Sequence, residues 1–369
     1  MPRTPRSKPE GLTFTAHASI RGFARWQVLD ERGVPEVPRS PSGFALAPVE
    51  GVRQPNLILN RGLDALPLYE SMEANPVHTS WREYLAVGTG SGAPSVGQEQ
   101  LGNEVARSDT KVTNGSNSYS LDTDANVFRA VIRRDLVCTL SSSANLTEYG
   151  FTHQPVQFVF NPQTEEDEPV YGDLHIRELL RDEFGTPVSI SLVGGKKLRV
   201  VHDLIAEIDA PEAGEALSFD IVEYDAANQF VATHAYDYTG GFAANAESVF
   251  KVWNPFPRSM AGSPTNAPYV FLWLQGNVYS RTTLSTNRAG GTEGGRATYL
   301  AYVGGTYERT VRRIIAATET AYNVTAAGVL FALGVNGGYS AVFTNPTTFV
   351  NAETHDLEVR LTSSWARAT

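Results

Sequence analysis

The chain has 369 residues, of which 41% are hydrophobic and 10% aromatic, and 40 acidic against 30 basic residues give it a net charge of −10. This length is enough for a large core and predicts two domains or one large β domain with insertions. The acidic balance argues against nucleic-acid binding, which needs a basic footprint. Because no apolar run approaches the ~18 residues of a membrane helix, no membrane span is expected.

The N-terminus and the single cysteine indicate where the protein folds. The first residues, MPRTPRSKPEG, are basic and proline-rich but lack an apolar segment, which argues against a secretory signal. Cys138 is the only cysteine, so an internal disulfide is excluded. Its position among apolar residues predicts a small core residue and not a nucleophile. We therefore expect folding in a reducing cytoplasm.

Residues 1–55 are expected to form an N-terminal arm followed by the first strands. Residues 18–29 alternate between apolar and polar side chains, as a half-buried strand does. Five prolines between Pro35 and Pro55 predict a loop. Residues 56–69 have the mixed apolar spacing of a short helix, which we expect to end before Pro67.

Two stretches of the chain resemble one another and predict a duplicated hairpin. Phe128–Phe151 alternates, is interrupted by a polar run at Ser141–Asn145, and then restarts as a second strand. Tyr307–Phe331 repeats this plan. There Arg312-Arg313 stands for Arg133-Arg134, and Asn323, Thr325 and Gly328 keep the spacing of Asn145, Thr147 and Gly150.

Many other short, alternating segments separated by turn residues predict strands. They are residues 81–87, 156–160, 174–180, 188–193, 198–205, 216–224, 229–238, 247–252, 269–279, 296–303, 340–343 and 357–365. This pattern predicts an all-β protein, an antiparallel β-sandwich with the duplicated hairpin and a Gly/Pro-rich inserted segment. The predicted parts are residues 1–55, a first sandwich part at 56–205, an insertion or second lobe at 206–295, and a C-terminal β part at 296–369 that echoes 128–151.

Two loops superficially resemble ligand-binding motifs. Gly88–Ala93 (GTGSGA) matches a dinucleotide loop, but no βαβ unit surrounds it, so we interpret it as a connector between strands. Asp122, Asp124 and Asn126 have the alternating oxygens of a calcium loop. However, Val127 replaces the required glycine and Arg133 the required glutamate, so a solvated loop is expected.

The remaining candidates for chemistry are weaker still. The acidic run Thr164–Glu168 predicts a solvated loop, and residues 98–107 predict a helical turn before the chain re-enters a strand. The seven histidines do not have metal-ligand spacing: they are His17, His78, His153, His175, His202, His234 and His355. Asn145-Leu-Thr147 and Asn323-Val-Thr325 match the glycan-acceptor pattern but are interpreted as turn residues. We predict no catalytic, cofactor-binding or metal-binding residues.

The arginine pairs are the least ordinary feature of the sequence. Because neighbouring residues of a strand face opposite sides, one arginine of Arg133-Arg134 and one of Arg312-Arg313 must point toward the apolar side. An inward arginine needs a carboxylate partner, and Glu148 and Asp135 are the candidates. An ion pair at a strand edge or subunit interface is the preferred interpretation.

A set of short motifs in fixed order resembles a group of virion proteins of tailed bacteriophages. The motifs are Asn56–Asp64 (NLILNRGLD), Val87–Ser95 (VGTGSGAPS), Leu101–Arg107 (LGNEVAR), Leu146–Phe151 (LTEYGF), Leu198–Val201 (LRVV) and the end of Leu357–Arg367 (SSWAR). Members of this group are tail, tail-fibre or minor structural proteins. The resemblance departs at residues 206–295 and carries over no catalytic residue.

The resemblance implies a non-enzymatic structural component of the virion, on the tail, neck, collar or capsid surface. We expect it to form a homo-oligomer with other virion proteins as partners, because exposed strand edges need to be covered. The proline-rich arm is expected to gain order against such a partner. A receptor-binding fibre module is the alternative: its partner would be a host surface glycan, stacked on Trp253, Trp273, Tyr236 or Tyr238. A polysaccharide depolymerase is a third hypothesis, but the sequence lacks a marked acid pair and a β-helix repeat.

Overall fold

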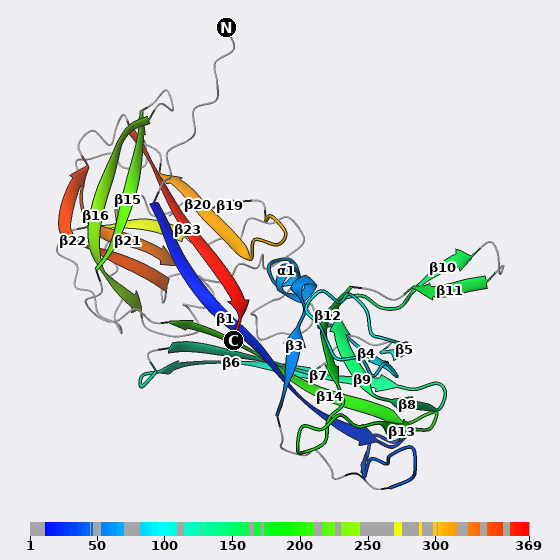
Figure 1. The fold of residues 1–369 in the computed structure, drawn as a ribbon. Coiled ribbons are helices and arrows are strands. Elements are labelled where there is room, and N and C mark those ends of the chain that lie inside the picture. The colour runs from blue at the N-terminus through cyan, green and yellow to red at the C-terminus, as the bar shows by residue number, and fades with distance from the viewer. Residues whose placement is uncertain are drawn as a thin grey trace. The chain divides into compact units, whose positions relative to one another are not determined.

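In the residues it describes, the computed structural model shows a mostly β protein with one short helix (Figure 1). It describes residues 12–44, 46, 53–69, 82–108, 114–125, 127–161, 166–170, 173–209, 216–225, 230–243, 269–274, 288–289, 298–300, 302–315, 324–332, 338–349 and 355–368. The all-β prediction is therefore confirmed, and the strand pairs with a described register are antiparallel. The finer prediction, a β-sandwich, is not confirmed, because the described strands are not clearly arranged in that way.

The chain divides into two compact units, which are described separately. Unit 1 comprises Met1–Ala18, Tyr119–Arg129 and Glu207–Trp365, and unit 2 comprises Ser19–Ser118, Ala130–Ala206 and Ala366–Thr369. Each unit therefore combines segments that are far apart in the sequence. The four-part division expected from composition stays a prediction.

The first fifteen elements are one helix and fourteen strands. They are β1 (Leu12–Leu29), β2 (Pro35–Glu36), β3 (Gln54–Ile58), α1 (Asn60–Tyr69), β4 (Tyr84–Gly88), β5 (Glu104–Arg107), β6 (Asn114–Asp122), β7 (Val127–Thr139), β8 (Ala144–Leu146), β9 (Glu148–Thr152), β10 (Gln157–Asn161), β11 (Glu166–Val170), β12 (Leu174–Leu179), β13 (Ile190–Leu192) and β14 (Lys197–Asp209). In unit 2 the pairing order is β5–β4–β9–β12–β3–β1–β2. The hairpin β10–β11 and the pair β8–β13 form small sheets of their own.

Unit 1 contains the remaining strands. They are β15 (Ala216–Asp225), β16 (Phe230–Ala243), β17 (Tyr269–Leu274), β18 (Arg288–Ala289), β19 (Thr298–Tyr299), β20 (Glu308–Ile315), β21 (Val324–Ala332), β22 (Gly338–Phe349) and β23 (His355–Arg367). Their pairing order is β18–β17–β21–β22–β16–β15–β23–β20–β19. Strands from residues 206–295 thus pair with strands from residues 296–369.

The alternation expected from the sequence is present in the burial of β7. Its even-numbered side chains, from Phe128 to Cys138, are buried, whereas the odd-numbered ones are half-buried or exposed. Cys138 is 0% exposed, so the prediction of a core cysteine is confirmed. Every residue of β4, β9 and β12 is buried, as expected for strands covered on both faces.

The predicted duplicated hairpin is wrong in its pairing. β9 does not pair back on β7, because β4 and β12 already occupy its two edges. The equivalent strands β20 and β21 are likewise separated, since β21 lies between β17 and β22. The polar run after β7 does turn the chain, but it leads into β8, which pairs with β13. Similar sequence therefore does not imply local pairing here.

Three local predictions also need correction. The helix α1 does not end before Pro67 but continues to Tyr69, because buried Leu63 and Leu66 anchor it. Residues 98–107 hold no helical turn: residues 99–103 are loop and bend, and β5 begins at Glu104. The acidic loop is partly strand, since Glu166–Val170 pairs with β10.

Candidate functional site

A buried ion pair occupies the middle of the unit 2 sheet. Glu148 begins β9 and Arg177 lies in the neighbouring strand β12. Their side chains are 0% and 1% exposed, and Arg177 Nη2 and Nε lie 2.7 and 2.8 Å from Glu148 Oε2. Charges removed from water to this degree are stable only when each is fully hydrogen-bonded.

Backbone amides complete the coordination of the Glu148 carboxylate. The amide nitrogens of Gly90 and Asn103 donate to Oε1 at 2.8 and 3.0 Å. The amide of Gly102 donates to Oε2 at 3.1 Å. Together with Arg177 these donors saturate both oxygens, so the carboxylate has no lone pair directed at an open space. We call Glu148, Arg177 and these three amides the Glu148 cluster.

The Arg177 guanidinium binds the same loop from its other side. Nη2 donates to the Gly92 carbonyl at 2.9 Å, and Nη1 donates to Gln98 Oε1 at 2.7 Å. Thr147, next to Glu148, adds a bond from its hydroxyl to the Gly90 carbonyl at 2.8 Å. The cluster thus fixes the loop between β4 and β5 to β9 and β12. Its chemistry is that of a structural anchor, because a fully satisfied, buried pair offers no general base or nucleophile.

Gly90 is required by the closeness of the loop to Glu148. A Cβ atom at this position would lie 2.3 Å from Glu148 Oε1 and 2.8 Å from the Gly102 Cα atom. The neighbouring Gly92, in contrast, has nothing within 4 Å of such an atom. The glycines of GTGSGA are therefore not equivalent: one permits contact with a carboxylate, whereas a phosphate-binding loop would use its glycines to approach a ligand.

The other motifs of the resemblance meet close by in unit 2. A Cβ atom on Gly62 of α1 would lie 2.3 Å from the His175 carbonyl oxygen, so this glycine lets the helix approach β12. The Asn60 amide donates to the Val96 carbonyl at 2.8 Å. Arg367 donates to the Ile58 carbonyl and to Asn60 Oδ1. Three segments that are distant in the sequence, at residues 58–60, 96 and 367, are thus joined by direct hydrogen bonds.

The interpretation of GTGSGA as a connector is confirmed. The loop joins the antiparallel strands β4 and β5, and Thr89 and Asn103 bond across it, with 2.9 Å between the Thr89 amide and the Asn103 carbonyl. The carboxylate partner was partly anticipated, since Glu148 does bind an arginine. Arg177 was missed; the available signal was an arginine next to Ile176 inside a predicted strand, residues 174–180.

One arginine of the Arg133-Arg134 pair points inward, as predicted. It is Arg134, and the predicted carboxylate partners are wrong. It is 2% exposed and donates to Asn117 Oδ1 at 3.0 Å and to the Arg133 carbonyl at 2.8 Å. Glu148 binds Arg177 instead, and Asp135 binds Arg199 across the β7–β14 pair at 2.9 Å. The outward Arg133 binds Asp203 with two bonds, at 2.7 and 2.9 Å. The side chains of Arg312 and Arg313 lie outside the described residues.

The remaining candidates give no reactive site in the described part of the chain. Asp122 accepts bonds from the amides of Asp124 and Ala125, as in an ordinary turn. Asn145 belongs to β8, where it accepts a bond from the Ser191 hydroxyl at 2.6 Å, so its interpretation as a turn residue is wrong. Among the described residues no group of three or more His, Cys, Asp or Glu is placed to hold a metal ion. The side chains of Trp253, Trp273, Tyr236 and Tyr238, proposed for sugar stacking, and the residues Asn126 and Asn323 lie outside the described residues.

A stacked histidine pair lies beside the cluster. The rings of His153 and His175 are 5.0 Å apart and nearly parallel, and His153 Nδ1 is 3.2 Å from His175 Nε2. Burial, followed by the charges of Arg61 and Arg107, lowers the pKa of His153 from 6.5 to about 4. The folded protein therefore holds this ring neutral at pH values where the unfolded chain protonates it.

Acidification is expected to destabilise unit 2 through His153. The unfolded chain binds more protons than the folded one between pH 6.5 and about 4, so stability is full above this window and is lost as the pH falls through it. The thermal midpoint of the His153→Gln variant should fall less steeply over this window than that of the unmodified chain. The measurement is a series of melting curves in matched buffers. Parallel curves for the two proteins would contradict the assignment.

Comparison of the chain with protein-family models, with curated proteins and with solved structures gave no match. In the described part of the chain, no helix has the length and apolar character needed to cross a membrane.

Proposed function

We propose that this chain is a non-enzymatic structural component of a tailed-phage particle. It assembles as a homo-oligomer with other virion proteins on the tail, neck or capsid surface. The support comes from the ordered motifs that resemble such proteins. Three of them are hydrogen-bonded to one another through Gly90, Asn103 and Glu148. A fourth, Asn56–Asp64, is bonded to β12, where the Leu59 amide donates to the His175 carbonyl.

The Glu148 cluster is the observation that carries the proposal. Residues selected to catalyse a reaction are exposed to substrate and often strained or incompletely bonded. Glu148 and Arg177 are instead sealed from solvent and saturated by five bonds to the carboxylate. The motif residues that form this cluster hold the β4–β5 loop against β9 and β12. A rigid framework is what an assembly protein requires, because its function is to present surfaces to neighbours.

Quantitative mass spectrometry of purified particles tests the proposal. Particles from an infection that produces this chain are expected to retain it after a high-salt wash. Its number of copies per particle is expected to be the same in independent preparations. A high-salt wash removes proteins held only by exposed charges, because salt screens these interactions. Recovery of the chain solely in the soluble lysate, or turnover of a host polysaccharide by the purified chain, would contradict the proposal.

A further inference from the structure

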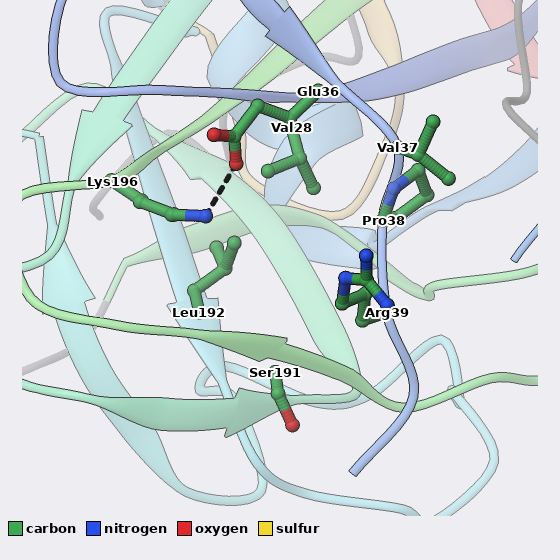
Figure 2. Close-up of a pocket in the computed structure, with 8 residues that line it drawn as sticks. All are labelled: Val28, Glu36, Val37, Pro38, Arg39, Ser191, Leu192 and Lys196. Atoms are coloured by element: carbon green, nitrogen blue, oxygen red, sulfur yellow. Dashed lines mark hydrogen bonds and ion pairs between the residues drawn. The ribbon is translucent and has the colours of Figure 1, made fainter. Parts of the chain in front are cut away.

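A small pocket in unit 2, of about 290 Å³, lies between β1, the segment after β2, and β13 (Figure 2). Its polar side chains have partners within the chain. Glu36 bonds to Lys196, Arg39 Nη1 donates to a backbone carbonyl at 3.1 Å, and the Ser191 hydroxyl donates to Asn145 Oδ1 at 2.6 Å. These polar groups therefore do not require a ligand, whereas a set of polar groups in the core of unit 2 does.

Three polar side chains in the core of unit 2 have atoms without a hydrogen-bond partner among the described residues. They belong to Asn56 in β3, Tyr149 in β9 and His202 in β14. The atoms concerned are both amide atoms of Asn56, the Tyr149 hydroxyl and His202 Nε2, and all of them are buried. Because an unpaired polar atom in a protein interior costs free energy, such atoms are nearly always bonded to the protein or to an ordered water.

The unpaired atoms lie close to one another. Gly22 of β1 is paired with Asn56, and a Cβ atom on this glycine would lie 2.0 Å from Asn56 Oδ1 and 2.9 Å from His202 Nε2. Both distances start at the same point, so the two atoms lie within about 5 Å of each other, a separation that one water bonded to both at roughly 2.8 Å can span. The Tyr149 hydroxyl is near the same amide: burial raises the pKa of Tyr149, and the Asn56 side chain opposes this shift.

The contact between Arg82 and His202 decides which ring nitrogen carries the proton. Arg82 Nη1 is hydrogen-bonded to His202 Nδ1. A guanidinium only donates hydrogen bonds, so Nδ1 must accept this one, and the neutral ring carries its proton on Nε2. Burial, followed by the charges of Arg82 and Arg134, lowers the pKa of His202 well below 6.5, which keeps the ring neutral. His202 Nε2 is therefore a buried N–H donor that needs an acceptor.

We propose that Asn56, Tyr149 and His202 bind one buried water molecule in the core of unit 2. The water accepts a hydrogen bond from His202 Nε2–H and donates one to Asn56 Oδ1, and the Tyr149 hydroxyl is its third partner. Three partners are the usual number for a buried water. Because the three side chains come from β3, β9 and β14, the water joins strands that are far apart in the sequence. This site is independent of the proposed function.

A crystal structure of the full chain, at a resolution that shows ordered waters, tests the site without any substitution. Electron density for one water is expected within about 3.2 Å of both His202 Nε2 and the Asn56 amide. A direct hydrogen bond between Asn56 and His202, with no water between them, would overturn the proposal. The same would follow from density for a water that contacts neither side chain.

Nuclear magnetic resonance of the full chain with ¹⁵N-labelled histidine supplies the second test. The His202 signal, assigned by its loss in His202→Gln, should show a proton on Nε2 and a cross-relaxation contact between this proton and a bound water. Asn56→Leu removes both amide atoms and should abolish the water contact. Asn145→Leu is the matched control, because Asn145 bonds to Ser191 elsewhere in unit 2, and it should leave the contact intact. A proton on Nδ1, or a water contact that persists in Asn56→Leu, would contradict the site.

Discussion

Replacing Glu148 by alanine is expected to destabilise unit 2 by about 3–5 kcal/mol. The change leaves the Arg177 charge buried at 1% exposure. It also removes the acceptor of the Gly90, Gly102 and Asn103 amides. Both losses act in the same direction, because an unpaired buried charge and an unsatisfied buried amide each cost free energy.

Hydrogen exchange of the β4–β5 loop measures this effect in the correct unit. In the variant, peptides covering residues 88–104 should exchange much faster. The denaturant concentration at which peptides from β9 and β12 lose their protection from exchange should fall. Asp135→Ala is the matched control, since it breaks an ion pair with Arg199 that is partly exposed. It should cost about 1 kcal/mol or less. Equal destabilisation by the two changes would contradict a special role for the cluster.

A double variant separates the ion pair from the anchoring of the loop. Buried ion pairs are often replaced by apolar residues without loss of stability. Glu148→Leu combined with Arg177→Met is nevertheless expected to remain destabilised by about 2 kcal/mol or more, because three loop amides still lack an acceptor. Full recovery would show that only the charge pair matters. Glu148→Gln keeps the shape and one acceptor oxygen, and serves if the alanine variant fails to fold.

Gly90→Ala and Gly92→Ala are expected to differ strongly, although the two glycines lie in the same loop. A Cβ atom on Gly90 would overlap Glu148 Oε1 at 2.3 Å, and the fully buried carboxylate has no space into which to move. We expect a loss of about 3 kcal/mol, near the upper end for overpacking. A Cβ atom on Gly92 meets nothing within 4 Å, so this change should stay within about 0.5 kcal/mol.

Denaturant unfolding of the three proteins, followed by exchange in unit 2 peptides, measures the difference. The two variants introduce the same methyl group two residues apart, so composition and loop length are matched. Similar midpoints for Gly90→Ala and Gly92→Ala would mean that the loop moves freely away from Glu148. A large effect of Gly92→Ala alone would contradict the geometry of the cluster.

The sequence alone correctly predicted features that depend only on residues close to one another in the chain. Alternation along residues 128–138 correctly predicted a strand with one buried face, one inward arginine in the Arg133-Arg134 pair, and the burial of Cys138. These features follow from the two-residue period of a strand and need no knowledge of its neighbours. The same local reasoning failed for Pro67, because the contacts that extend α1 past this residue come from other parts of the chain.

Only the tertiary structure shows which strands pair and which charged side chains bind one another. The repeated hairpin pattern predicted that β7 and β9 are neighbours, yet β4 and β12 occupy the edges of β9. Glu148 was recognised as a carboxylate available to an arginine, but its partner is Arg177 of β12, and Arg134 binds Asn117 instead. Strand alternation states which side of a strand is buried and not which strand lies beside it, because that choice depends on contacts between residues far apart in the chain.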